Sequence, residues 1–268
     1  MSTERLYFVH ISDTHFGLTK DYKIHGRLSY PCAQKLVYII NHLPTKPDFV
    51  IHTGDVATEP DNRAYQLAAE TLADLNVPIY YAVGNHDTAE GIRQHLQMGP
   101  KEDLDDDGLL CYAFTVKGHR FLVVDAKGPA EVEPGGLLSE RQLGLIQREA
   151  TATGPPLTVF LHFPILPLNS TWFDENGLVV NGELMHQALL PARQRLRGVF
   201  FGHIHQHMQL VRDGILYASV ASAVTQFAAW PDTAEPSQNA DPFPGYNFVH
   251  LLPQQTIIHH HTFPYPIS

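Results

Sequence analysis

The chain has 268 residues, of which 44% are hydrophobic and 17% are charged. A chain of this length and apolar content can bury a large core, which excludes a disordered protein and makes stabilising disulfides unnecessary. We expect a single domain over residues 1–268. No stretch approaches the ~20 apolar residues of a membrane-spanning helix, and the first residues lack the pattern of a secretory leader, so we expect no membrane association.

The numbers of charged, cysteine and histidine residues indicate which functions are compatible with the sequence. The net charge of −10 argues against nucleic-acid binding, which depends on clustered Lys and Arg. The two cysteines, Cys32 and Cys111, do not form a Cys-x-x-Cys pair, and we expect a cytoplasmic protein. The 17 histidines nearly equal the 18 Lys and Arg residues, and imidazole is the commonest protein ligand for transition metals. Composition therefore favours metal chemistry.

The first half of the chain alternates short apolar runs with helical patterns. Residues 6–12, 49–52 and 78–83 are predicted strands, and each of them stops at a polar segment. Residues 33–43 and 63–75 carry the spacing of helices. Strands that alternate with helices indicate a largely parallel sheet, whose ligand sites lie beyond the carboxyl ends of its strands.

The second half mixes strands and helices differently. Residues 111–116 and 120–125 predict a hairpin, and Ser139 with Gln142 predicts a capping box. The Pro-, Asp- and Asn-rich residues 231–244 predict an ordered insertion or a mobile flap. The remaining predictions are strands at 157–162 and 198–205, short strands within 207–218 and 246–262, and helices at 139–150 and 182–195.

Side chains that can bind metals follow several of these strands. Asp13 and His15 are two residues apart, as are His203 and His205, so in an extended chain each pair points to one side. The ends of other predicted strands carry Asp55, Asn85, His86 and His162. One such residue is most simply a turn former. Several at one edge of a sheet indicate a metal site instead.

Other side chains fit structural roles. We expect His52 to be a buried strand histidine, residues 259–261 to lie on a partly exposed strand, and residues 102–107 to form a solvated turn. His207 is expected to point away from the ions. Four aromatic residues fit core packing, or stacking on a nucleobase if their loops overhang the metals: Trp172, Phe173, Phe227 and Trp230.

The order Asp-Thr-His, Gly-Asp, Gly-Asn-His-Asp, His and Gly-His-Ile-His resembles the calcineurin-like metallophosphoesterase superfamily. The segment ISDTHFG makes the chain most similar to class III cyclic-nucleotide phosphodiesterases and related bacterial phosphodiesterases. The motifs run from Asp13 to His205, about three quarters of the chain, and none is missing. The resemblance implies an α/β (α+β) fold, a four-layer αββα sandwich of two mixed β-sheets flanked by helices. Residues 219–268 carry no motif and would form a cap or a contact in a homodimer.

The resemblance also implies two sets of metal ligands at the carboxyl ends of the strands. One set is Asp13, His15, Asp55 and His205, and the other is Asp55, Asn85, His162 and His203. Asp55 would bridge the ions, because two cations ~3.5–4 Å apart need a shared anion to offset their repulsion. Nitrogen and oxygen ligands fit two divalent or trivalent ions of manganese, iron, zinc or cobalt.

The implied reaction is hydrolysis of a small phosphoester by a hydroxide that bridges the two metal ions. His86, which is not a ligand in the family, would stabilise the transition state and protonate the leaving group. Asp87 would orient His86, although the role of a turn former fits it equally. The resemblance ranks phosphodiesters above phosphomonoesters, and 3′,5′-cyclic nucleotides such as cAMP are one candidate substrate.

Three other functions use a similar set of residues. The first is a phosphomonoesterase with the same site, and the second is a non-catalytic scaffold of the same fold. A scaffold is expected to lose ligands, whereas this chain retains them all. The third is a metal-dependent hydrolase of C–N or C–O bonds, but such enzymes usually carry an early His-x-His motif that this chain lacks.

Overall fold

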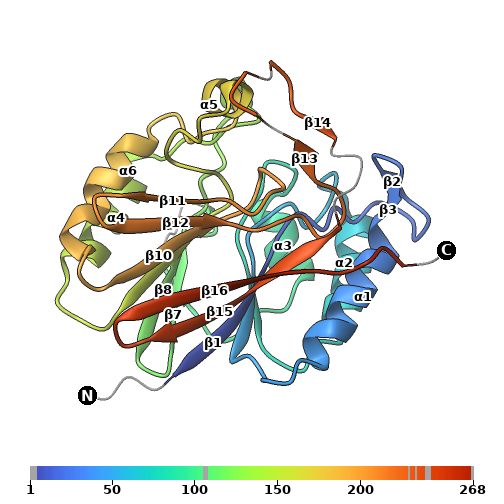
Figure 1. Ribbon diagram of the computed structural model, residues 1–268, viewed down its shortest axis with the longest axis horizontal. Coiled ribbons are helices and arrows are strands. Elements are labelled where there is room, and N and C mark those ends of the chain that lie inside the picture. The colour runs from blue at the N-terminus through green and yellow to red at the C-terminus, as the bar shows by residue number, and fades with distance from the viewer. Residues whose placement is uncertain (1–4, 105–107, 229, 233, 239–242, 267–268) are drawn as a thin grey trace.

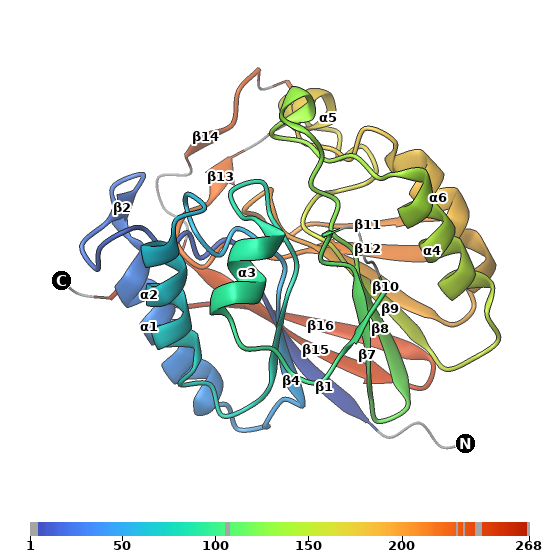
Figure 2. The same ribbon diagram turned by 180° about the vertical axis from the view of Figure 1, so that it is seen from behind.

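The computed structural model describes residues 5–104, 108–228, 230–232, 234–238 and 243–266. Two large β-sheets pack face to face, and helices lie on the outer side of each sheet (Figure 1 and Figure 2). This arrangement confirms the predicted α/β sandwich of two mixed sheets flanked by helices.

The first sheet has five strands: β1 (Leu6–Ile11), β4 (Phe49–His52), β5 (Ile79–Tyr81), β15 (Gly245–Leu252) and β16 (Gln255–Thr262). Their order in the sheet is β16-β15-β1-β4-β5. β1, β4 and β5 are parallel, while β15 runs antiparallel to both β1 and β16. The carboxyl ends of the three parallel strands therefore meet at one edge.

The second sheet has seven strands: β6 (Glu102–Asp103), β7 (Tyr112–Val116), β8 (His119–Val123), β9 (Leu157–Phe160), β10 (Leu196–Phe201), β11 (Gln209–Arg212) and β12 (Ile215–Ser219). Their order is β11-β12-β10-β9-β8-β7-β6. β8, β9, β10 and β12 are parallel, and antiparallel strands complete both edges. Two short hairpins lie outside the sheets: β2 (Lys23–Ile24) with β3 (Arg27–Leu28), and β13 (Phe227–Ala228) with β14 (Ser237–Gln238).

The helices form the outer layers. Those beside the first sheet are α1 (Ser29–Asn41), α2 (Asn62–Leu72) and α3 (Ala89–His95). Those beside the second sheet are α4 (Glu140–Thr151) and α6 (Gly182–Leu189), while α5 (Thr171–Asn176) lies at the end that carries the β13–β14 hairpin (Figure 1). Short 3₁₀ turns span 130–132 and 190–192. The predicted capping box of Ser139 and Gln142 starts α4.

Several boundaries differ from the sequence prediction. α1 begins at residue 29 rather than 33, because Pro31 falls in the first turn, where a missing N–H costs nothing. The predicted helix over 182–195 stops being α-helical at residue 189, since Pro191 follows two residues later. The helices α3 and α5 were not predicted.

Three other segments also differ. β10 ends at Phe201, so residues 202–205 form a loop rather than strand. Glu102 and Asp103 pair with β7 as a short strand instead of a turn, and the rest of that acidic run includes residues 105–107, outside the described chain. Within the predicted insertion at 231–244, Ser237 and Gln238 form β14. Residues 245–262 complete the first sheet.

No helix of the described chain is long and apolar enough to cross a bilayer.

Phe8 of β1 fills the space between the two sheets. Its ring lies 5.2 Å from that of Phe49 in the same sheet, and 5.5 and 5.3 Å from those of Phe160 and Phe200 in the opposite sheet. All four side chains are buried. Aromatic packing at these distances joins the sheets and fixes their separation, and therefore the distance between their strand ends.

We expect Phe8→Ala to lower the free energy of unfolding by about 3–5 kcal/mol, because a ring-sized cavity would open between the sheets. Urea denaturation followed by circular dichroism measures this change. Leu184→Ala, on the exposed side of α6, is the control and should change stability by less than about 0.5 kcal/mol. An equal effect of both substitutions would contradict this role of Phe8.

Candidate metal centre

The seven predicted metal ligands lie together, beyond the carboxyl ends of five parallel strands. Loops after β1, β4 and β5 of the first sheet and after β9 and β10 of the second sheet carry them. They are Asp13, His15, Asp55, Asn85, His162, His203 and His205, and all are buried except Asn85, which is half-buried. Packing of the two sheets therefore creates the site, because neither sheet alone supplies the whole set.

The first group contains Asp13, His15 and His205. Nε2 of His205 lies 3.3 Å from Oδ1 of Asp13 and 3.2 Å from Nε2 of His15. The residues come from the loops after β1 and β10, one in each sheet. Their donor atoms face a common point.

The second group contains Asp55, His162 and His203, with Asn85 beside them. Oδ2 of Asp55 lies 3.4 Å from Nε2 of His162. Oδ1 of Asn85 lies 3.1 Å from Nε2 of His162 and 3.0 Å from Nδ1 of His203. An amide oxygen, a carboxylate and two imidazoles thus converge.

Asp55 lies between the two groups. Its Oδ2 is 3.4 Å from His162 of the second group and 3.8 Å from Nε2 of His15 in the first. Its Oδ1 accepts a hydrogen bond of 2.9 Å from the backbone N–H of His86. One fixed carboxylate therefore faces both groups.

Hydrogen bonds at the far side of two imidazoles decide which nitrogen faces the cluster. Nδ1 of His162 lies 2.6 Å from the carbonyl oxygen of Thr53, and Nδ1 of His205 lies 2.8 Å from that of Thr225. A carbonyl only accepts, so each Nδ1 carries the proton. In the neutral ring, each Nε2 then has a lone pair that can bind a metal ion at the cluster.

The backbone is unusual at the same residues. Asp13, His15, Asp55, His203 and His205 all have positive φ, between 46° and 66°. Residues with side chains rarely adopt this left-handed conformation, although Asp and His tolerate it better than most. Hydrogen bonds between loops hold it, among them Asp13 N–H to the Gly54 carbonyl and His15 N–H to the Asp55 carbonyl, both 3.0 Å. Clustered strain of this kind is typical of functional sites.

Two glycines allow the loops to approach closely. A Cβ on Gly84 would lie 2.1 Å from Oδ1 of Asp55, and one on Gly202 would lie 2.0 Å from Oγ of Ser12. Both contacts are far shorter than atoms permit. Gly84 precedes Asn85 and Gly202 precedes His203. Only glycine fits at these two positions, because the loops that carry Asp55 and Asp13 pack directly against them.

Burial and charge set the protonation of the cluster. Burial lowers the pKa of His15 and of His203 to about 3, so both imidazoles are neutral at neutral pH. Burial acts in the same direction on His162, but the adjacent Asp55 carboxylate overrides it and raises the pKa of His162 to about 9. Without a metal ion, a proton on His162 thus neutralises Asp55. A cation at that position can take its place.

His86 and Asp87 occupy different environments. The His86 side chain is exposed, its ring lies 5.2 Å from that of His15, and its Nδ1 is 2.8 Å from the carbonyl oxygen of Thr58. Asp87 is buried and accepts from the backbone N–H groups of Val56, Ala57 and Gly84. The predicted orientation of the His86 ring by Asp87 is not what the contacts show, since Thr58 holds the ring. Asp87 joins the loops that carry Asp55 and Asn85.

The sequence analysis did not identify Lys127. Its Nζ donates to the carbonyl oxygens of Asn85, at 2.9 Å, and Asp87, at 2.7 Å, and thereby holds the backbone on both sides of His86. Lys127 follows β8, so its place after a parallel strand was the available signal. An ammonium group is not a metal ligand, so the metal-binding pattern of the strand ends does not include Lys127.

Several other histidines and aromatic residues make structural contacts. His52 is buried and its Nε2 lies 2.9 Å from Oγ1 of Thr14, which confirms a structural strand histidine. His207 is half-buried against the ring of His260, at 4.4 Å. Residues 259–261 lie on the exposed part of β16, as expected. Phe173 is buried and Trp172 packs edge-on against it, which fits core packing.

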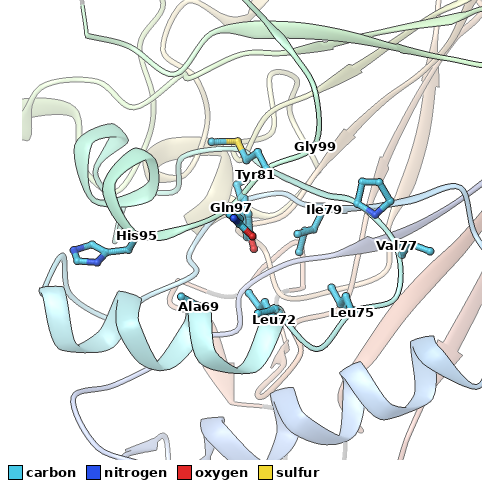
Figure 3. Close-up of a pocket in the computed structure, with 12 residues that line it drawn as sticks. Ala69, Leu72, Leu75, Val77, Ile79, Tyr81, His95, Gln97 and Gly99 are labelled. Carbon is cyan, nitrogen blue, oxygen red and sulfur yellow. The ribbon is translucent and has the colours of Figure 1, made fainter.

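Two pockets of similar size lie in different parts of the molecule. One, of about 590 Å³, lies between α2, β5 and residues 95–99, and contains none of the seven predicted ligands (Figure 3). The other, of about 670 Å³, is lined by His205 together with Phe227, Trp230 and Phe243. Only this second pocket shares a residue with the cluster.

The cluster fits two metal ions on the chemistry of its donors. Oδ1 of Asp13 is buried without a hydrogen-bond partner. Imidazole nitrogens lie 3.2 Å apart, both between His15 and His205 and between His162 and His203, and Nδ1 of His15 and Nε2 of His203 are buried without a partner. Two ions would satisfy these atoms, with Asp55 facing both. Fold and donor set together define an α/β sandwich protein with a site for two metal ions.

Comparison with known proteins identifies the family. The family model for calcineurin-like phosphoesterases matches residues 6–207, and the chain belongs to this family. It is therefore a hydrolytic phosphoesterase, as predicted. The match covers every one of the predicted ligands.

Individual relatives agree with this assignment. The chain is 28% identical to a probable glycerophosphodiester phosphodiesterase, GpdQ, of Arcobacter nitrofigilis, over 82% of this chain and 79% of the relative. It is 27% identical to the 3′,5′-cyclic adenosine monophosphate phosphodiesterase CpdA of Escherichia coli, over 83% and 78%. A dimetal phosphatase from Danio rerio has the same fold, with a TM-score of 0.68, 16% identity and coverage of 98% and 100%.

We expect Asp55→Asn to lose metal, because the substitution removes the charge that faces both groups. After loading with manganese and removal of free ions, wild-type protein should retain two ions per chain by mass spectrometry of the metal, and the variant at most one. Asp74→Asn, at an exposed carboxylate, is the control and should match the wild type. Two ions retained in Asp55→Asn would show that the bridge is elsewhere.

Proposed function

We propose that this protein is a metal-dependent phosphodiesterase that hydrolyses small phosphodiesters at the cluster around Asp55. One ion would be held by Asp13, His15, Asp55 and His205, and the other by Asp55, Asn85, His162 and His203. The observation that carries the proposal is the placement of Asp55 within 4 Å of a histidine from each group, at 3.8 Å and 3.4 Å.

Bound metal ions would supply Lewis-acid stabilisation of charge on the phosphoryl oxygens and lower the pKa of a coordinated water. The donors are imidazole nitrogens, carboxylate oxygens and one amide oxygen, without a thiolate, which favours manganese, iron, zinc or cobalt over calcium. Asp13 and Asp55 offset only part of the charge of two such ions. An anionic phosphoester is therefore attracted to the site although the chain is acidic.

His86 would give a proton to the leaving group. Its Nδ1 donates to the Thr58 carbonyl, which leaves Nε2 as the atom that can transfer a proton. The contact of its backbone N–H with Oδ1 of Asp55 and the bonds of Lys127 to the neighbouring carbonyls fix its position. Thr58 and Lys127 are thus positioning residues, and His86 is the proposed catalytic acid.

The names of the relatives support diesters over monoesters. Two of them are described as a glycerophosphodiester phosphodiesterase and a cyclic AMP phosphodiesterase, so both act on diesters. Cyclic nucleotides are one candidate substrate of this chain. The buried thiols Cys32 and Cys111 suit a reducing compartment such as the cytoplasm.

A direct test compares esters with one leaving group. With manganese, bis(p-nitrophenyl) phosphate should be hydrolysed with a kcat/KM several-fold above that of p-nitrophenyl phosphate, since both release p-nitrophenol but only the first is a diester. Parallel assays with 2′,3′- and 3′,5′-cyclic nucleotides test that substrate class. A preference for the monoester would make the protein a phosphomonoesterase.

We expect His86→Ala to lower kcat for an unactivated diester by roughly 10²–10⁴-fold, the usual contribution of positioned proton transfer. Its metal content should equal that of wild type, which separates proton transfer from metal binding. His42→Ala, at the end of α1, is the matched control and should retain full rate. A fully active His86→Ala enzyme would exclude the proposed acid.

A further inference from the structure

The pocket beside the cluster has an aromatic wall. Phe227 stacks on the imidazole of His205, with ring centroids 4.5 Å apart and planes at 23°. His205 and Phe227 both line the pocket of about 670 Å³, and Trp230 and Phe243 line it as well. A phosphoryl group held at the cluster thus lies next to this pocket, and one of its ester groups can enter it.

Two of these side chains are exposed, which indicates that they contact a bound ligand. Trp230 is 71% exposed and Phe243 is 51% exposed, and no other Trp or Phe in the described part of the chain is exposed. A soluble surface rarely places two such rings at one hollow unless they bind something. Their position at the metal cluster makes substrate the natural occupant.

The polarity of the lining narrows the chemistry of that occupant. The described residues of the pocket include no Asp, Glu, Lys or Arg, so the pocket favours an uncharged group over a second phosphate. Aromatic walls favour a planar group, which can stack on them. The exposed amide of Asn169, at the rim, can donate and accept hydrogen bonds along the edge of such a group. A nucleobase combines these properties, whereas glycerol does not.

The position of His86 indicates which of the two ester groups of a phosphodiester enters the aromatic pocket. His86 packs near His15 and is not among the residues of the pocket, which adjoins His205. The group that leaves beside His86 is therefore different from the group held by the aromatic wall. The pocket holds the substituent that stays on the phosphate.

We propose that the pocket formed by Phe227, Trp230 and Phe243 binds the nucleoside that remains on the phosphate after hydrolysis, and so selects nucleotide diesters over simple alkyl diesters. This inference rests on the proposed function and adds its substrate class. Trp230 and Phe243 are the specificity-determining residues, because Phe227 also supports a predicted ligand.

The kinetic test uses two diesters with the same leaving group, thymidine 5′-(p-nitrophenyl) phosphate and ethyl p-nitrophenyl phosphate. In the manganese-loaded wild type, kcat/KM for the thymidine ester should exceed that for the ethyl ester by roughly tenfold, the usual effect of stacking one base. Trp230→Ala and Phe243→Ala should bring this ratio towards one. Tyr38→Ala, at an exposed ring of α1, should keep the wild-type ratio. A wild-type ratio near one, or an unchanged ratio in both variants, overturns the proposal.

A binding test is independent of turnover. The chain has two tryptophans, so Trp172→Phe leaves Trp230 as the single fluorescent indole. Titration of this manganese-loaded variant with adenosine 5′-monophosphate should quench its fluorescence to saturation, and inorganic phosphate should not. Quenching without hydrolysis of either ester would support the pocket and reject the phosphodiesterase. Hydrolysis of both esters at equal efficiency without quenching would reject the pocket and leave the phosphodiesterase intact.

Discussion

The structure depends on placing two carboxylates, Asp13 and Asp55, in the interior beside four imidazoles. Burial of a carboxylate is costly unless polar partners or cations compensate for the lost water. His205 faces Asp13 at 3.3 Å, and His162 faces Asp55 at 3.4 Å. Asp55 also points towards His15 of the first group, and this shared carboxylate makes two adjacent metal ions possible.

The need to bring these carboxylates and imidazoles together explains backbone strain and close contacts that would otherwise oppose folding. Five cluster residues take a left-handed backbone, and Gly84 and Gly202 lie where any side chain would collide. The aromatic layer around Phe8 provides the rigid support, since it joins the sheets whose strand ends carry the ligands. A stable core thus carries the strain of the loops, as expected where function rather than stability selects the geometry.

The proposed chemistry and the proposed specificity use separate parts of this molecule. The proposed phosphoester chemistry uses residues at the strand ends, within the segment 6–207 that matches the family. The aromatic pocket uses Phe227, Trp230 and Phe243, which lie beyond that segment. Loops outside a shared catalytic framework are free to vary, so such a division lets one metal centre serve different esters.

The sequence alone determined the alternation of strands and helices, the capping box at Ser139 and the seven ligand candidates, because periodicity and strand-end motifs are local properties. The start of α1 and the short strand at Glu102 were misjudged, since Pro31 decided the first and pairing with β7 the second. Only the tertiary structure showed that Thr58 rather than Asp87 holds the His86 ring, that Lys127 fixes its backbone, and that Trp230 and Phe243 line one pocket together with His205. These contacts join distant segments, and the packing of two sheets, which no local pattern encodes, brings them together.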